Sequence, residues 1–116
     1  MAVSVEKDAF SGMDEAYDVL KARKLWPMTS CNAFLERETP HWHPYDNTIL
    51  VIEGEANFYA GADQELVHAT PGDIINVPAR SLHAVEAPTP VTFLVCFDRP
   101  VRRDEIVNNP PEALES

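Results

Sequence analysis

The ten prolines of this chain constrain its fold more than any other feature of the sequence. The first of them is Pro27, and the rest separate short apolar runs from one another down to Pro111. Because proline fixes φ and lacks an amide hydrogen, it is excluded from helix interiors and from the middle of central strands. The chain after Pro27 therefore cannot be a helical bundle, and we expect short strands joined by turns.

The runs between the prolines have the character of strands. Each is apolar or alternates with a period of two, and turn sequences such as Glu53-Gly54-Glu55 and Pro71-Gly72-Asp73 separate them. Many short strands with tight turns are typical of an all-β sandwich or barrel. The predicted strands are Cys31–Leu35, Thr48–Glu53, Ala56–Tyr59, Glu65–Ala69, Ile74–Val77, His83–Ala87 and Val91–Phe97.

One helix is predicted ahead of the strands. Ser11 and Asp14 fit a capping box, in which a serine begins the helix and an acid three residues later supports it. Pro27 prevents the helix from continuing. Residues at helical spacing then follow the cap, with basic residues at the end: Met13, Ala16, Tyr17, Leu20, Arg23 and Lys24.

The length of 116 residues is that of one domain. We expect an N-terminal helical extension over residues 1–28, a β-barrel over 29–98 and a tail over 99–116 that packs outside the barrel. The two cysteines, Cys31 and Cys96, lie in apolar runs without a CxxC neighbour, so we expect buried free thiols.

Charge and hydropathy restrict the partners. Nineteen acidic residues against nine basic ones give a net charge of −10, which argues against nucleic acid and against anionic membrane surfaces. No run reaches the roughly 18 apolar residues of a membrane span. The N-terminus lacks the basic and then apolar layout of a signal peptide. We therefore expect a soluble cytoplasmic protein whose partner is a small molecule.

His41 and His43 are the first candidates for chemistry. Two histidines at i and i+2 on a strand point to the same face, so their imidazoles can converge on one metal ion. Such a pair also occurs by chance on surfaces and in cores, so the pair alone leaves its role open. Trp42, between them, should point to the opposite face and pack in the core of the sheet.

A second block of residues gives the histidine pair a context. Gly54 follows the pair, and a later block contains Gly72, Pro78 and His83. These blocks resemble the two sequence motifs of the cupin superfamily. The resemblance implies an all-β fold, namely a single-domain barrel of the cupin type, or double-stranded β-helix, with a short N-terminal helix.

The resemblance also implies a metal site. It assigns His41, His43 and His83 as ligands of a divalent metal, with iron, manganese, nickel and zinc left open. Asn47 stands where the family motif has a metal-binding glutamate, and Asp46 beside it would be the carboxylate ligand if the preceding turn differed by one residue. An Asn47 that binds weakly or not at all, an Asp46 ligand and a barrel without functional metal all remain open.

Three further positions depart from the motifs, since Leu35, Arg80 and Ala87 replace two glycines and an asparagine. Arg80, on the turn before the third histidine, is a solvated turn residue or an anion clamp at the barrel mouth. Tyr45, in the loop after His43, lines the cavity or is exposed. Tyr45 and Arg80 are therefore the candidate catalytic side chains.

The family resemblance implies a metal-dependent enzyme acting on a small oxygen-bearing molecule, with dioxygenase the most common redox outcome. A non-redox lyase or isomerase and a non-catalytic small-molecule-binding cupin are the alternatives. Small members of the family are commonly dimers, so we expect a homodimer. The N-terminal segment and the apolar run Val91–Phe97 could supply its interface.

Overall fold

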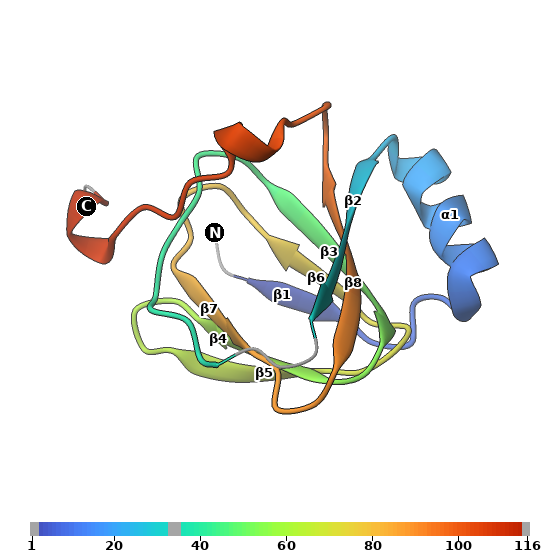
Figure 1. Ribbon diagram of the computed structural model, residues 1–116, viewed down its shortest axis with the longest axis horizontal. Coiled ribbons are helices and arrows are strands. Elements are labelled where there is room, and N and C mark those ends of the chain that lie inside the picture. Colours follow the sequence, from blue (N-terminus) through green and yellow to red (C-terminus); the bar gives the residue numbers. More distant parts are fainter. Residues whose placement is uncertain (1–2, 33–35, 115–116) are drawn as a thin grey trace.

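The computed structural model describes residues 3–32 and 36–114, which form two facing antiparallel sheets and one helix outside them (Figure 1). The strand order is β1-β6-β3-β8-β2 in the five-stranded sheet and β5-β4-β7 in the three-stranded sheet. This architecture confirms the predicted all-β fold with a short N-terminal helix. The elements are β1 (Ser4–Glu6), α1 (Gly12–Arg23), β2 (Trp26–Asn32), β3 (Asn47–Glu53), β4 (Ala56–Ala60), β5 (Glu65–Ala69), β6 (Ile74–Val77), β7 (His83–Glu86), β8 (Val91–Phe97) and two 3-10 helices (Arg103–Glu105 and Pro111–Ala113).

The predicted strands agree with β5, β6 and β8 and differ from β3, β4 and β7 by one residue at one end. The first two strands are different. Strand β1 was not predicted, and β2 begins at Trp26 and includes Pro27, which was expected only to end the helix. Because β2 lies at the edge of its sheet, the missing amide hydrogen of Pro27 can be tolerated. The end of the predicted strand Cys31–Leu35 lies outside the described residues.

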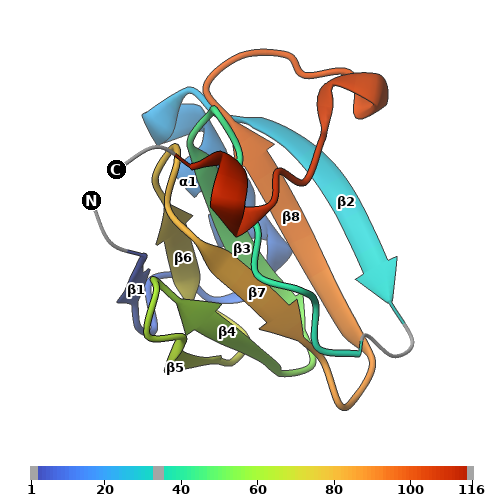
Figure 2. The same ribbon diagram turned by 90° about the vertical axis from the view of Figure 1, so that its left-hand side faces the viewer.

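The central strands of the larger sheet are buried on both faces. Ile49 and Val51 on β3 point into the barrel, whereas Leu50 between them packs against α1. Figure 2 shows α1 behind this sheet, on the face away from β4 and β7. Burial on both faces explains why the run Val91–Phe97 is apolar almost throughout. The same alternation places Asn47 on the inner face, with Ile49 and Val51.

Ser11 is the N-cap of α1, as predicted, but the cap hydrogen bonds differ from the prediction. The Ser11 side chain makes no capping hydrogen bond, and its backbone N–H donates to the Glu15 carboxylate (N to Oε1, 3.0 Å) rather than to Asp14. Ala16 and Leu20 are buried, whereas the Tyr17 side chain is exposed. The helix is therefore held by packing of one narrow face on the sheet.

Asp73 ties the N-terminal segment to the turn before β6. Its carboxylate is fully buried and accepts hydrogen bonds from the Lys7 ammonium, from the Asp8 amide (3.0 Å) and from the Thr70 amide (2.8 Å) and hydroxyl (3.1 Å). Burial acts to raise the pKa of Asp73, but the hydrogen bonds from Lys7, Thr70 and Asp8 outweigh it and hold the pKa below its usual value. The charged form of Asp73 therefore stabilises the fold.

Glu6 on β1 leads to a prediction about acid. Arg23 donates two hydrogen bonds to its carboxylate (2.8 and 2.9 Å) and Asn76 donates a third (2.9 Å), which lowers the pKa of Glu6 to about 2. A carboxyl whose pKa is lower in the folded state contributes stability above its unfolded pKa and loses it as the pH falls. We expect the free energy of unfolding, measured by urea denaturation, to fall as the pH is lowered from about 5 towards 2. The fall should be smaller in Glu6→Gln, and an equal fall would contradict this role of Glu6.

Cys96 is a free, fully buried cysteine, and burial raises the pKa of its thiol to about 12. The predicted buried thiol is thus confirmed for Cys96, while the Cys31 side chain is not among the side chains that the structure describes. Within residues 3–32 and 36–114, no helix is long and apolar enough to cross a membrane.

The ends of the chain contribute to the architecture in different ways. Residues 4–6 pair with β6, so the N-terminal segment supplies a strand as well as the helix. The chain after β8 runs across one end of the barrel (Figure 1), and no residue from 98 to 114 is buried. The division into units at residues 28 and 98 stays a prediction.

Candidate metal site

Backbone pairing brings His41 and His83 together. The His41 amide donates to the His83 carbonyl, and the His83 amide donates to the His41 carbonyl, both at 2.9 Å. Two further bonds continue this pairing, from the Glu38 amide to Val85 (3.0 Å) and from the Arg80 amide to His43 (2.7 Å). The segment over residues 38–43 therefore lies alongside β7, which carries His83.

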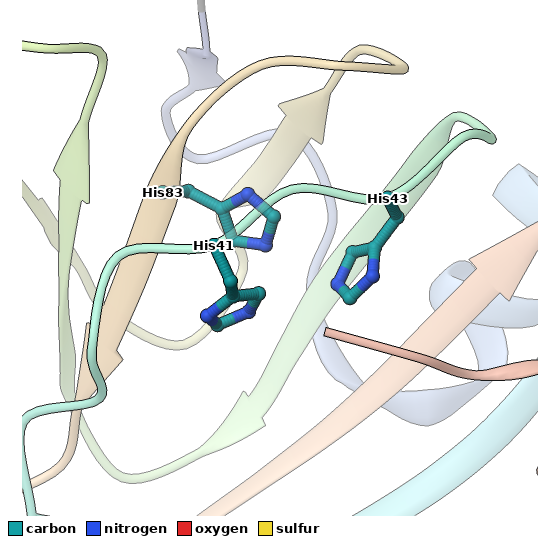
Figure 3. A group of neighbouring side chains, drawn as sticks. All are labelled: His41, His43 and His83. Carbon is teal, nitrogen blue, oxygen red and sulfur yellow. The ribbon is translucent and has the colours of Figure 1, made fainter. Parts of the chain in front are cut away.

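The three imidazoles face one another (Figure 3). Their ring centroids are 4.5 Å apart for His41 and His83, and 5.1 Å apart for each pair that includes His43. One ring nitrogen from each residue lies within 4.8 Å of the others. Three nitrogen donors at these separations can bind a single divalent ion.

A backbone carbonyl fixes the tautomer of each imidazole. The Nδ1 atom lies 2.8 Å from Thr39 O in His41, 2.9 Å from Val107 O in His43 and 3.0 Å from Ser81 O in His83. Since a carbonyl oxygen can only accept, each Nδ1 carries the proton and each Nε2 keeps its lone pair. This arrangement is typical of histidines that bind metals through Nε2.

The electrostatic surroundings favour neutral imidazoles. Burial, together with the neighbouring His41 and His43, lowers the pKa of His83 to about 4 against the opposing effect of the bond to Ser81. Burial likewise lowers the pKa of His43, against the opposing bond to Val107. Both imidazoles are therefore neutral at pH 7, which metal binding requires.

Asn47 and Asp46 occupy different environments. The Asn47 side chain is 7% exposed and lines the cavity, and its Oδ1 has no hydrogen-bond partner among the residues that the structure describes. Asp46 is exposed, and its Oδ1 accepts a 2.7 Å hydrogen bond from the Ala79 amide. An unpaired buried oxygen costs about 1–3 kcal/mol, which a metal or a substrate donor at the site would offset. The residues present thus fit a divalent metal, with an amide rather than a carboxylate beside the histidines.

This difference between Asn47 and Asp46 predicts that substitutions at the two positions affect metal binding differently. Asn47→Glu should raise the affinity for a divalent metal, because a carboxylate adds a charged oxygen ligand, and should lower activity because the ion becomes less electrophilic. Asp46→Ala should leave metal content unchanged, since Asp46 already bonds to Ala79. Metal content of the purified variants, set against the wild type, measures both. Loss of metal in Asp46→Ala with no response to Asn47→Glu would assign the carboxylate ligand to Asp46.

The histidines open into a cavity of about 550 Å³ whose walls are part apolar and part polar. Two charged side chains line it, Glu38 and Arg103. The Glu38 Oε1 accepts a 2.9 Å bond from the Val85 amide and lies 3.9 Å from His41 Nε2. Neither residue could be predicted from the sequence as part of the site, because neither stands in a motif and folding alone brings them to the histidines. The apolar wall consists of Met28, Ile49, Phe58, Val85, Phe93, Val95, Phe97 and Ile106.

The structure separates the two candidate catalytic side chains. Tyr45 lines the cavity, with its ring stacked on His43 at 5.2 Å, and its hydroxyl is buried without a partner in the described part of the chain. Burial raises the pKa of Tyr45, so its hydroxyl keeps the proton at pH 7. Arg80 is not among the cavity-lining residues, and its Cζ lies 5.0 Å from the centre of the Trp42 ring.

Trp42 has a different environment from the one expected. It is 8% exposed but belongs to neither apolar core cluster. Its indole Nε1 donates a 3.0 Å hydrogen bond to the Pro110 carbonyl. Trp42 is thus covered by the C-terminal segment rather than packed within the core of the sheet.

Comparisons with known proteins show the family and the fold of this chain. A family model described as cupin domain matches residues 36–97, and no curated protein matches the chain. Among solved structures, a cupin superfamily protein from Desulfitobacterium hafniense is 20% identical, with a TM-score of 0.55 over 82% of this chain and 75% of that one. A ribosomal oxygenase from Escherichia coli is 25% identical, with a TM-score of 0.54 over 67% of this chain and 24% of that one. An oxalate decarboxylase is 23% identical, with a TM-score of 0.57 over 67% of this chain and 22% of that one.

The family match covers more than half of the 116 residues and includes all three histidines and the strands from β3 to β8. The solved structures share the fold of this chain at low sequence identity. The chain therefore belongs to the cupin family.

Proposed function

We propose that this protein is a metal-dependent enzyme that acts on a small oxygen-bearing molecule. His41, His43 and His83 would hold a divalent metal, with Asn47 as a weak fourth ligand. The observation that carries the proposal is the convergence of three Nε2 lone pairs at the wall of a cavity of about 550 Å³. That volume suits a small organic molecule.

A divalent metal bound there would supply a Lewis acid for a carbonyl, enol or hydroxyl oxygen, and iron would add dioxygen chemistry. The side chains around it would orient the substrate. The Tyr45 hydroxyl, which has no partner among residues 3–32 and 36–114, can donate to a substrate oxygen. The apolar walls, Phe58 and Phe93 among them, would exclude water from the reacting atoms.

The charges of the cavity support a substrate with an anionic group. Arg103 is the one lysine or arginine among the described lining residues, and its guanidinium makes no hydrogen bond or ion pair within the described chain. An arginine binds a carboxylate in bidentate fashion. Keto acids are therefore the first substrates to test, ahead of diketones, catechols and thiols.

A second candidate function, a non-redox lyase or isomerase, is favoured by Glu38. Its carboxylate is held by the Val85 amide and lies 3.9 Å from His41 Nε2, at the edge of the metal site. A carboxylate in that place can accept a proton from a substrate carbon or hydroxyl group. Such a reaction needs neither dioxygen nor a change of oxidation state.

The test combines metal analysis of the purified protein with turnover and oxygen consumption against the four substrate classes. Iron together with oxygen consumption would support a dioxygenase, and turnover without oxygen would support the lyase or isomerase. Arg103→Ala should raise the KM for keto acids more than Arg103→Lys does, because lysine keeps the charge. Binding without turnover would leave a small-molecule-binding cupin, and a protein without affinity for divalent metals would overturn the proposal.

We also propose that the protein is a homodimer. Strand β2 lies at the edge of the larger sheet, and the nearby side chains of Trp26 and Tyr17 are each 54% exposed. The run Val91–Phe97, expected to contribute, is paired with β3 and β2, so it has no free edge for strand pairing with a second copy. Light scattering at micromolar concentration should give about twice 13.0 kDa, and a monomer would contradict the dimer.

A further inference from the structure

The three candidate ligands are not oriented in the same way. His41 and His83 each donate from Nδ1 to a carbonyl two residues earlier in the chain. His43 donates instead to Val107, which lies 64 residues later. The orientation of two ligands is therefore local, whereas that of the third depends on the far end of the chain.

Residues 107–110, here called the strap, lie beside residues 41–43, here called the HxH segment, and an isolated antiparallel β-bridge joins the two. The Trp42 amide donates to the Asn109 carbonyl and the Asn109 amide donates to the Trp42 carbonyl, both at 3.1 Å. The Asn109 side-chain amide donates to the same Trp42 carbonyl (3.2 Å), and the Trp42 indole donates to Pro110. The HxH segment is thus paired with β7 on one side and with the strap on the other.

Hydrogen bonds rather than core packing hold the strap. None of its residues is buried, and Val107 is 54% exposed. A segment with little buried apolar surface opens at a low free-energy cost. The residues just before it, Arg103 and Ile106, and Asn108 within it line the cavity. Opening of the strap would therefore release His43 and remove part of the cavity wall together.

We propose that docking of the strap and binding of the metal are coupled, so that the strap is a positioning element of the metal site. This inference rests on the proposed metal site. With the strap docked, the Val107 carbonyl keeps the proton of His43 on Nδ1 and the lone pair on Nε2. With the strap open, the ring can rotate and the proton can move to Nε2, which removes a ligand. Because coupling between two binding events is reciprocal, the metal must stabilise the docked strap to the same extent.

The first experiment measures zinc affinity by competition with a chromogenic chelator. Asn109→Pro removes both hydrogen bonds that Asn109 donates to Trp42 and changes no residue that lines the cavity. Loss of the partner that orients a histidine ligand weakens metal binding about 10–100-fold, so we expect a loss of about tenfold. Asn109→Ala, which keeps the backbone donor, should lose less zinc affinity than Asn109→Pro. Trp42→Phe should also lower zinc affinity. Trp26→Phe, the same change at an exposed site, is the control and should leave zinc affinity unchanged.

The second experiment needs no variant, because the Asn109 amide itself reports docking. Its hydrogen exchange should slow about tenfold when zinc saturates the wild-type protein, by the same linkage. The Ala9 amide, which donates to Gly72 at 2.8 Å far from the site, should not respond. Without metal, His43→Ala should speed exchange at Asn109, whereas His83→Ala should not, because His83 bonds to Ser81.

The outcomes separate this inference from the proposed function. Zinc affinity unchanged in Asn109→Pro, or exchange at Asn109 unchanged by zinc, would overturn the coupling while the metal site stands. A wild-type protein that binds no divalent metal would overturn both. Weaker zinc binding in Asn109→Pro together with zinc-slowed exchange at Asn109 is the result expected from coupling.

Discussion

His83→Ala is expected to lower the affinity for zinc by about a hundredfold or more and to leave the fold intact. A site of three imidazoles loses one of its protein ligands, and two imidazoles with an amide hold a divalent ion poorly. The fold should survive because His83 lies at the cavity and belongs to neither apolar core cluster. Metal content after dialysis and the circular dichroism spectrum of the variant measure the two effects.

His68→Ala is the matched control for this experiment. His68 is the fourth histidine of the chain and is exposed on β5, where it contacts Asn57 (2.8 Å) and Glu55 (2.9 Å). Its loss should leave metal content unchanged. Full metal occupancy in His83→Ala would show that the three histidines do not share an ion, and equal loss in His68→Ala would point to nonspecific binding.

Gly54→Ala should lower the free energy of unfolding by about 3 kcal/mol or more, the largest effect on stability that we expect from one methyl group. Gly54 lies in the turn between β3 and β4 with φ of +81°, in the left-handed region that favours glycine. A Cβ there would overlap the carbonyl oxygen of Pro90 and lie 2.8 Å from the Val91 Cα. Both obstacles are backbone, so neither can move aside as a side chain would.

Gly61→Ala separates the clash from the backbone strain. Gly61 has a similar φ of +72°, but no atom lies within 4 Å of the position that its Cβ would take. Gly61→Ala should lower the free energy of unfolding by only about 1 kcal/mol, which is the conformational part of the penalty. Urea denaturation of both variants gives the comparison, and equal costs would mean that the approach of Pro90 to Gly54 has no energetic weight.

The strands from β3 to β8 and the pair His41 and His43 could be predicted from the sequence because both follow from local periodicity. Alternation along a strand decides which face a side chain takes, and a histidine pair at i and i+2 must share a face. Prolines and glycines at the turns then mark where each strand ends. The resemblance to the cupin motifs supplied the third histidine, His83, which no local pattern links to the pair.

Local periodicity could not decide whether Asn47 or Asp46 faces the cavity. A change of one residue in the preceding turn would exchange their faces, and the sequence does not state the length of that turn. The structure begins β3 at Asn47, on the same face as Ile49, and turns Asp46 outward to the Ala79 amide. The reason is geometric. Side chains alternate between the two faces of a strand, so the face taken by the first residue decides the face of every residue after it.

Pairing between distant parts of the chain was decided by the tertiary structure alone. Pro27 lies in a strand because β2 is at the edge of its sheet, a position that is known only once every strand is placed. Glu38, which precedes β3, and Arg103, which follows β8, line the same cavity although they are far apart in the sequence. The Val107 carbonyl orients His43, which lies 64 residues earlier in the chain. Because every residue has a backbone carbonyl, the side chain at position 107 could not predict this contact. The sequence by itself determined the strands from β3 to β8 and the pair His41 and His43, because these depend on neighbours along the chain, and the family motif added His83. Only the tertiary structure decided how the imidazoles are oriented and what surrounds them, because those contacts form between segments that folding alone brings together.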